Sequence, residues 1–164
     1  MSRFLPTEFV DSVYDIDISK LKEKGIKGFL FDIDNTLVTY AMPLPDQKVT
    51  DWLNGLKKAG FGIYLISNNK EYRVKPFAEK LGVGYIAKAL KPRRKPILKA
   101  CREMGITIDE AVLVGDQLFT DIWGGSRMGM HTILVKPISE VEDSFVKFKR
   151  KLERIVMKNW KKKG

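Results

Sequence analysis

The chain has 164 residues, 44% of them hydrophobic and 30% charged, a composition that predicts one soluble domain over residues 1–164 with a core of its own. A single cysteine excludes an internal disulfide, and a lone histidine without a cysteine cluster argues against a zinc site or a Ser-His-Asp triad. No apolar stretch reaches roughly eighteen residues, so we expect a cytoplasmic protein without a membrane-spanning helix.

Short apolar runs alternate with helical patterns along the chain. The runs cover residues 28–33, 61–66, 85–87, 111–114 and 132–135, and the helical patterns cover residues 50–59, 70–81, 94–104, 121–128 and 139 to about 158. Strands that alternate with helices pair in parallel, because each helix crosses back over the sheet. The sequence therefore predicts an α/β fold with a central parallel sheet of about five strands and helices on both faces.

Two acids, Asp32 and Asp34, follow the first apolar run. Just past a strand's end the backbone can bend, so both carboxylates can converge on one ligand at the sheet edge where α/β folds bind ligands. One carboxylate can serve as nucleophile or metal ligand while the other transfers a proton. The structural alternative is a turn in which Asp34 and Asn35 cap their own backbone.

Later strands are followed by possible partners for these acids. Residues 67–69, Ser-Asn-Asn, follow the second run and offer hydroxyl and amide groups for an oxyanion. Asp116 and then Asp121 follow the fourth run and add ligands for a hard cation. Lys91, which precedes a proline, follows the third run and can neutralise a phosphate.

The ordered set D-x-D-x-T, serine after a strand, Lys-Pro and G-D-x-x-x-x-D, within residues 28–121, resembles the haloacid dehalogenase (HAD) superfamily and specifically its phosphatases. Residues 5–16, 25–28 and 115–122 are similar to the bacterial YqeG family of HAD subclass IIIA, which is related to phosphatidylglycerophosphate phosphatases. The resemblance implies a three-layer Rossmann-like HAD fold and a Mg²⁺-dependent phosphomonoester hydrolase.

The resemblance also implies roles for the acids. Asp32 would attack phosphorus and form an aspartyl-phosphate. Asp34 would protonate the leaving alkoxide and then deprotonate the attacking water. Mg²⁺ would bind the carboxylates of Asp32 and Asp116 and the backbone carbonyl of Asp34.

The same resemblance assigns the phosphate contacts. Ser67, Asn68 and Lys91 would bind the phosphoryl oxygens, where charge accumulates in the transition state. Lys88 is a rival for the lysine role, but the Lys-Pro pattern favours Lys91. Asp121 would orient the metal site or Lys91.

The spacing of the motifs leaves no room for a cap domain. About thirty residues separate Thr36 from Ser67, and about twenty-three separate Ser67 from Lys91, enough for one crossover helix in each interval. Caps in this superfamily usually enclose small substrates, so the resemblance implies a bulky or surface-bound one. In the loop over residues 39–45, Tyr40 and Met42 are either contacts of the leaving group or ordinary packed side chains.

Positive charge is concentrated at the end of the chain. Of a formal net charge of +10, residues 144–164 carry nine Lys or Arg against one acid, Glu153. A helical stripe that begins just before this segment comprises Val141, Phe145, Phe148, Leu152, Ile155 and Val156, with Trp160 beside it. One interpretation packs this stripe on the sheet and leaves a lysine tail in solvent. The other adds attraction of the lysines to anionic lipid headgroups at the membrane surface.

Phosphatidylglycerophosphate is the expected substrate on the strength of the family resemblance, and a soluble sugar phosphate or nucleotide is the alternative. A phospho-receiver module would not need a second acid two residues after the nucleophile. A pI near 9.6 also suits a nucleic-acid-binding module, but no recognised binding motif accompanies it, so we expect no nucleic acid partner.

Overall fold

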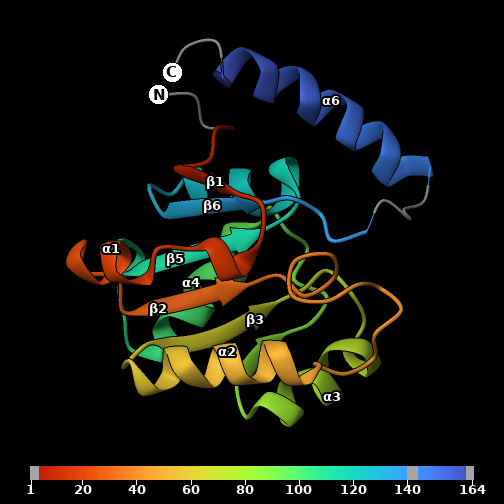
Figure 1. The fold of residues 1–164 in the computed structure, drawn as a ribbon. Helices are drawn as coiled ribbons and strands as arrows, with labels where there is room; N and C mark the ends of the chain where they lie inside the picture. Colours follow the sequence, from red (N-terminus) through yellow and green to blue (C-terminus); the bar gives the residue numbers. More distant parts are fainter. Residues whose placement is uncertain (1–3, 140–143, 162–164) are drawn as a thin grey trace.

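The computed structural model describes residues 4–139 and 144–161. Six parallel strands form one open sheet in the order β1-β6-β5-β2-β3-β4 (Figure 1). The strands are β1 (Glu8–Val10), β2 (Gly28–Phe31), β3 (Gly62–Ile66), β4 (Gly84–Ile86), β5 (Ala111–Gly115) and β6 (His131–Val135). The parallel α/β fold expected from the sequence is confirmed, with one strand more than the five predicted.

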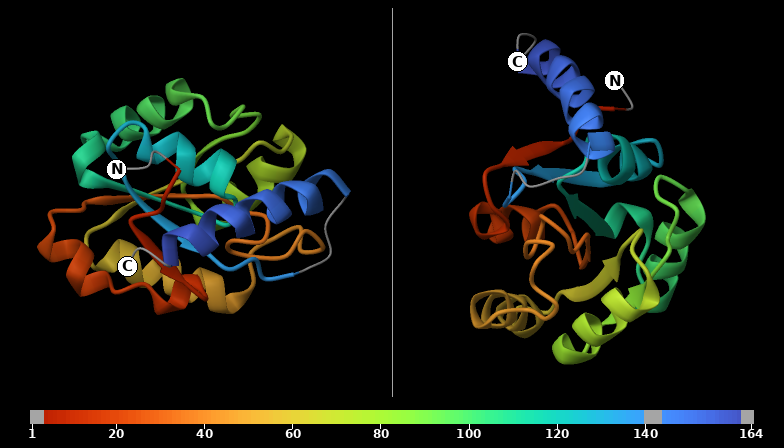
Figure 2. Two further views of the ribbon diagram at one scale, coloured as in Figure 1. Left: turned by 90° about the horizontal axis from the view of Figure 1, so that it is seen from above. Right: turned by 90° about the vertical axis from the view of Figure 1, so that its right-hand side faces the viewer.

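Helices cover both faces of this sheet. They are α1 (Ile18–Glu23), α2 (Gln47–Lys58), α3 (Glu71–Leu81), α4 (Arg94–Met104), α5 (Trp123–Ser126) and α6 (Ser144–Lys161), with single turns η1 (Val13–Asp15), η2 (Ile108–Glu110) and η3 (Leu118–Ile122). Phe29 and Phe31 of β2 pack with α1, α2 and α3, while Leu30 points to the opposite face and packs with α4. Figure 2 shows the resulting three layers.

Successive β2 side chains thus enter two different cores, as the pleat of a strand requires. One helix, α2, connects β2 to β3, and one helix, α3, connects β3 to β4. These two connections contain no cap domain, as the spacing of the motifs predicted.

Two elements near the start of the chain were not predicted. The three residues of β1 pair with β6 at the edge of the sheet and are only half-buried. A strand this short and this exposed does not need the apolar run by which the other strands were predicted. The six-residue α1 is too short for a clear helical period, although Asp17 accepts a hydrogen bond from the backbone N–H of Lys20 at its start. The helix predicted at residue 121 instead begins as the π-helical turn η3 at Leu118.

The last helix differs most from expectation. It lies beyond the sheet edge formed by β1 and β6 (Figure 1). Most of the described residues of its predicted apolar stripe do not pack on the sheet, since Phe148, Leu152 and Ile155 are 60%, 40% and 55% exposed. Val156 packs partly, against the small cluster of Leu118 and its neighbours. The described residues do not include Val141 and the side chain of Phe145, which belong to the predicted stripe, or Lys162 and Lys163, which belong to the predicted lysine tail.

In the described part of the chain, no helix has the length and apolar character to cross a membrane.

Candidate active site

The carboxyl ends of the strands bring most of the predicted polar side chains together. Asp32 and Asp34 follow β2, Ser67 follows β3, and Asp116 follows β5. All are buried, as are Lys91 and Asp121. After β2 the chain turns sharply, because the backbone N–H groups of Thr36 and Leu37 both donate to the carbonyl of Ile33, and Asn35 adopts a left-handed φ of 61°.

Three of the acids form one cluster. Carboxylate oxygens of Asp32, Asp116 and Asp121 lie within 4.8 Å of one another. The Thr36 hydroxyl lies 3.1 Å from both Asp32 Oδ2 and Asp116 Oδ1, which fixes the two carboxylates relative to each other. Gly115 permits this arrangement, since a Cβ there would lie 2.3 Å from the carboxyl carbon of Asp121. The glycine of the G-D motif is therefore needed for Asp121 to enter the cluster.

Lys91 is the positive charge at the centre of this cluster. Its Nζ lies 2.8 Å from Asp32 Oδ1 and 2.5 Å from Asp121 Oδ1. Asn68 holds the lysine backbone, because its Oδ1 accepts a 2.7 Å hydrogen bond from the N–H of Lys91. Burial works to lower the pKa of Lys91, but the carboxylates of Asp121 and Asp32 outweigh burial and raise that pKa. The ammonium therefore stays charged in a buried position.

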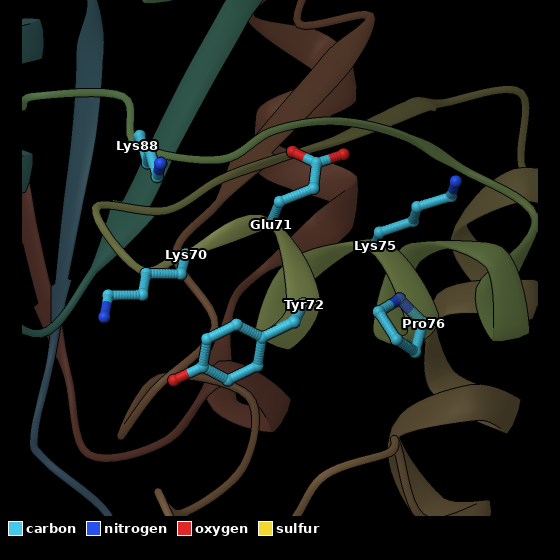
Figure 3. Close-up of a pocket in the computed structure, with 6 residues that line it drawn as sticks. All are labelled: Lys70, Glu71, Tyr72, Lys75, Pro76 and Lys88. Carbon is cyan, nitrogen blue, oxygen red and sulfur yellow. The ribbon is translucent and has the colours of Figure 1, made fainter.

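The rival lysine lies elsewhere. Lys88 is exposed and lines a surface hollow with Lys70, Tyr72 and other residues around the start of α3 (Figure 3). Lys91 contacts the acids, whereas Lys88 lines this hollow. The choice of Lys91 as the phosphate-binding lysine stays a prediction.

The cluster holds more negative charge than its cations neutralise. Burial raises the pKa of Asp121 to about 6, with Lys91 opposing and Asp32 adding to this rise. Burial, followed by repulsion from Asp32, also raises the pKa of Asp116, although Arg150 opposes it. Carboxyl groups whose pKa is raised in this way are stabilised by a bound cation, which relieves their mutual repulsion.

Asp34 points to different partners from those of Asp32. Asp34 Oδ2 accepts a 3.1 Å hydrogen bond from Asn69 Nδ2, and Asp34 Oδ1 is paired with Arg73 of α3. The Asp34 carboxylate is therefore not part of the three-acid cluster. Sequence reasoning missed Arg73 because one arginine in the first turns of a helix resembles any solvated charge.

Ser67 is buried at the start of the next turn. Its hydroxyl accepts a 3.0 Å hydrogen bond from the backbone N–H of Asn69, which shapes the turn that presents the Asn69 side chain to Asp34. This contact leaves the hydroxyl hydrogen for another acceptor. The role of Ser67 in phosphate binding stays a prediction.

The last helix contributes two further residues that the sequence did not reveal. Arg150 donates to both the carboxylate and the backbone carbonyl of Asp116. Glu153 is buried and accepts hydrogen bonds from the backbone N–H groups of Leu118 and Phe119, at 2.8 and 3.4 Å. These bonds fasten α6 to the segment that follows β5, so one face of the helix belongs to the site. The Arg-x-x-Glu spacing places both residues on one helix face, but solvated helices carry the same spacing, so it could not single them out.

A parallel sheet that presents a paired aspartate motif, a serine, a lysine and a third acid at its carboxyl edge has the arrangement of the HAD-like hydrolases. A HAD-hydrolase-like family model matches residues 89–144. The phosphatase YrbI of Haemophilus influenzae, solved in a cobalt-bound form as a deoxy-D-mannose-octulosonate 8-phosphate phosphatase, aligns with a TM-score of 0.57 over 70% of each chain. Its sequence identity of 14% makes this a likeness of fold alone.

Sequence relatives are closer. The chain is 42% identical over 161 residues to "Probable phosphatase YqeG" of Bacillus subtilis (strain 168), covering 98% of this chain and 94% of that protein. It is 32% identical over 170 residues to "Phosphatidylglycerophosphate phosphatase 1, chloroplastic/mitochondrial" of Arabidopsis thaliana, and the alignment covers 98% of this chain and 49% of the plant protein. The chain thus spans about half the length of the plant relative. It belongs to the YqeG family of HAD-type phosphatases, which are phosphoric monoester hydrolases.

Proposed function

We propose that this phosphatase transfers the phosphoryl group of its substrate to Asp32 before hydrolysis. The observation that carries the proposal is the fixed orientation of the Asp32 carboxylate, with Lys91 on Oδ1 at 2.8 Å and Thr36 on Oδ2 at 3.1 Å. An Asp32 oxygen forms a bond to phosphorus while the bond from phosphorus to the leaving oxygen breaks. Asp34 gives its proton to that oxygen, which leaves as an alcohol.

The second half of the proposed reaction restores the enzyme. Water attacks phosphorus and gives a proton to Asp34, and the bond from phosphorus to Asp32 breaks, which releases phosphate. Lys91 and the Ser67 hydroxyl hold phosphoryl oxygens during both displacements, and Asn68 fixes the position of Lys91.

Mg²⁺ is the proposed cofactor, and the acid cluster fits it. Oxygens about 2.1 Å from a single octahedral ion lie at most about 4.2 Å apart, so oxygens already within 4.8 Å need only a small adjustment. We assign Asp32, Asp116 and the backbone carbonyl of Asp34 as ligands, with Asp121 orienting Lys91. When bound, the ion reduces the repulsion between carboxylate and phosphate.

Phosphatidylglycerophosphate is the proposed substrate. The plant relative supports this choice by its name, and a groove beside the acids supports it by its chemistry. The groove has a volume of about 900 Å³, lies between α6 and the end of β6, and includes Asp116. Among its lining side chains are Lys136, Lys147, Lys151 and Arg154. A leaving group that carries its own phosphodiester would bring a second negative charge to these cations.

The test is phosphate release from lipid and soluble phosphomonoesters in parallel. The full-length protein with Mg²⁺ should hydrolyse p-nitrophenyl phosphate and should prefer phosphatidylglycerophosphate to a sugar phosphate or a nucleotide. Asp32→Asn should abolish release from every substrate while thermal unfolding stays close to wild type. Near-normal turnover in this variant would overturn the aspartyl-phosphate route, and a preference for the sugar phosphate would overturn the lipid assignment.

A further inference from the structure

Three faces of α6 have different surroundings. The inward face carries Glu153, Val156 and Met157, which contact the segment after β5 and the small core cluster beside it. The outward apolar face carries Phe148, Leu152 and Ile155 at i, i+4 and i+7, and it is largely exposed. Between these two faces runs a basic face, which consists of Lys147, Lys151, Arg154 and Lys158, all exposed.

The exposed apolar face is unusual because α6 packs on the domain through another face, so these three apolar side chains stay outside that contact. The helix packs on the domain through a face that includes a buried acid, while three large apolar side chains point to solvent. Exposed apolar residues that line up on one helix face mark an interaction surface more often than scattered ones do. A partner that covers the apolar face must therefore contact apolar side chains and also the basic side chains of the neighbouring face.

We propose that α6 docks on an anionic lipid surface. Phe148, Leu152 and Ile155 enter the boundary between headgroups and acyl chains, and the neighbouring lysines contact lipid phosphates. The charge of the whole chain, formally +10, favours such a surface and disfavours a second copy of the same chain as the occupant.

The docked helix is joined to the catalytic cluster. Arg150 bonds to Asp116, and Glu153 bonds to the backbone of Leu118, so α6 cannot move far without disturbing these contacts. The basic groove lies on the side of α6 that borders the basic face, because Lys147, Lys151 and Arg154 belong to both. Docking would therefore hold the groove at the lipid surface. The inference deepens the proposed function and rests on it for the identity of the substrate, whereas docking itself involves no catalytic residue.

Vesicle sedimentation of the full-length protein tests docking without catalysis. The probes are vesicles of phosphatidylglycerol mixed with phosphatidylcholine, and vesicles of phosphatidylcholine alone. The wild type should bind the anionic vesicles and lose this binding as salt increases. Leu152→Ser should reduce the affinity by about tenfold, since a leucine side chain no longer leaves water.

Leu98 supplies the matched control for the apolar face. It is an exposed leucine of α4, 41% exposed against 40% for Leu152, and it lies on a helix remote in the fold from α6. Leu98→Ser should bind vesicles as the wild type does. If the two leucine variants lose vesicle binding equally, or if neither loses any, the proposed docking face is wrong.

A second pair of variants tests the basic face. Lys158→Gln should weaken binding to anionic vesicles by about fivefold, the effect of one basic residue at such a surface. Lys95→Gln, at an exposed lysine of α4, should change it less. If Lys158→Gln and Lys95→Gln weaken binding by the same factor, attraction to the membrane is a property of net charge and the docking assignment fails.

Two further readouts separate the proposals. All four variants should hydrolyse p-nitrophenyl phosphate at the wild-type rate; vesicle binding without any hydrolysis would reject the proposed function and leave docking intact. Sedimentation velocity without lipid should show a monomer, and a dimer that Leu152→Ser dissociates would assign the apolar face to a second copy instead.

Discussion

Two nitrogens of Arg73 donate hydrogen bonds to the same carboxylate oxygen of Asp34. Its Nε and Nη2 donate to Asp34 Oδ1 at 3.2 and 2.8 Å, while its Nη1 donates to the backbone carbonyl of Pro43 at 3.0 Å. One guanidinium thus connects Asp34, the residue proposed to act as both general acid and general base, to the loop over residues 39–45. The orientation of Asp34 and the position of that loop therefore depend on the same side chain.

Replacing Arg73 with lysine should separate charge from geometry. A lysine keeps one positive charge but cannot reproduce the fork of donors, so Asp34 would lose its fixed orientation. We expect kcat for p-nitrophenyl phosphate to fall by about tenfold, part of the 10²- to 10⁴-fold that general acid–base catalysis contributes. Arg94→Lys, at an exposed arginine of α4, is the control and should leave kcat unchanged. Equal rates in the two variants would show that Arg73 has no positioning role.

Asp34→Asn should impair proton transfer more than metal binding. The amide cannot donate or accept the proton, so turnover should fall by about 10²- to 10⁴-fold. The backbone carbonyl assigned to Mg²⁺ is unaffected by the substitution. Titration of the variant with Mg²⁺, followed by the rise in its melting temperature, should give nearly the wild-type affinity. A large loss of Mg²⁺ affinity would instead make the Asp34 carboxylate a metal ligand.

The sequence predicts the parts of this protein that follow a repeated local rule. Apolar runs between helical patterns predict the parallel sheet, and acids after such runs place Asp32 and Asp116 correctly because parallel strands end at one edge. The lysine before proline could be distinguished from Lys88 by its motif. These features depend on neighbours in the sequence and on the sheet.

What the sequence does not predict depends on contacts between distant elements. Arg73 and Arg150 have no motif of their own, and each acquires a role only when its helix meets an acid from another strand. The interpretation that the apolar stripe of α6 packs on the sheet is wrong for its described residues Phe148, Leu152 and Ile155, for a related reason. An apolar stripe normally faces the core, but here the buried Glu153 holds the helix to the domain by another face. No local sequence pattern indicates which face of the helix packs.

Lys91→Met should destabilise the protein in a manner that depends on pH. The substitution leaves the buried carboxylates of Asp32 and Asp121 without their shared cation, and removal of one partner from a buried pair costs about 3–5 kcal/mol of unfolding free energy. Burial already raises the pKa of Asp121 to about 6, and loss of Lys91 should raise it further. The folded variant therefore holds a proton that the unfolded chain has released.

The sign of the pH dependence follows from this difference in bound protons. Where the folded state binds more protons than the unfolded state, stability falls as pH rises. Urea unfolding of Lys91→Met should therefore show a larger deficit relative to wild type at pH 8 than at pH 5. The matched control, Lys95→Met on the surface of α4, should show no deficit at either pH. A deficit independent of pH would mean that lost packing, and not unpaired charge, limits the variant.

His131 should give the opposite pH dependence at the edge of the sheet. Its Nε2 lies 2.9 Å from Glu8 Oε1, which joins β6 to β1. Burial lowers the pKa of His131; Glu8 opposes this effect, while Lys20 and Lys24 add to it. A histidine whose folded pKa is lowered binds its proton more readily in the unfolded chain, so it contributes stability above its unfolded pKa of about 6.5. That contribution should be lost as pH falls through the interval between the unfolded and folded values.

The measurement is the urea midpoint of wild type and His131→Gln from pH 8 to pH 5. The glutamine amide can still donate to Glu8 but does not titrate in this range, so the difference between the two proteins isolates the histidine. We expect the wild type to lose stability relative to the variant as pH falls below about 6.5. If the wild type instead gains stability relative to His131→Gln on acidification, the ion pair with Glu8 outweighs burial, and the protonated imidazolium is the form that holds β1 to the sheet.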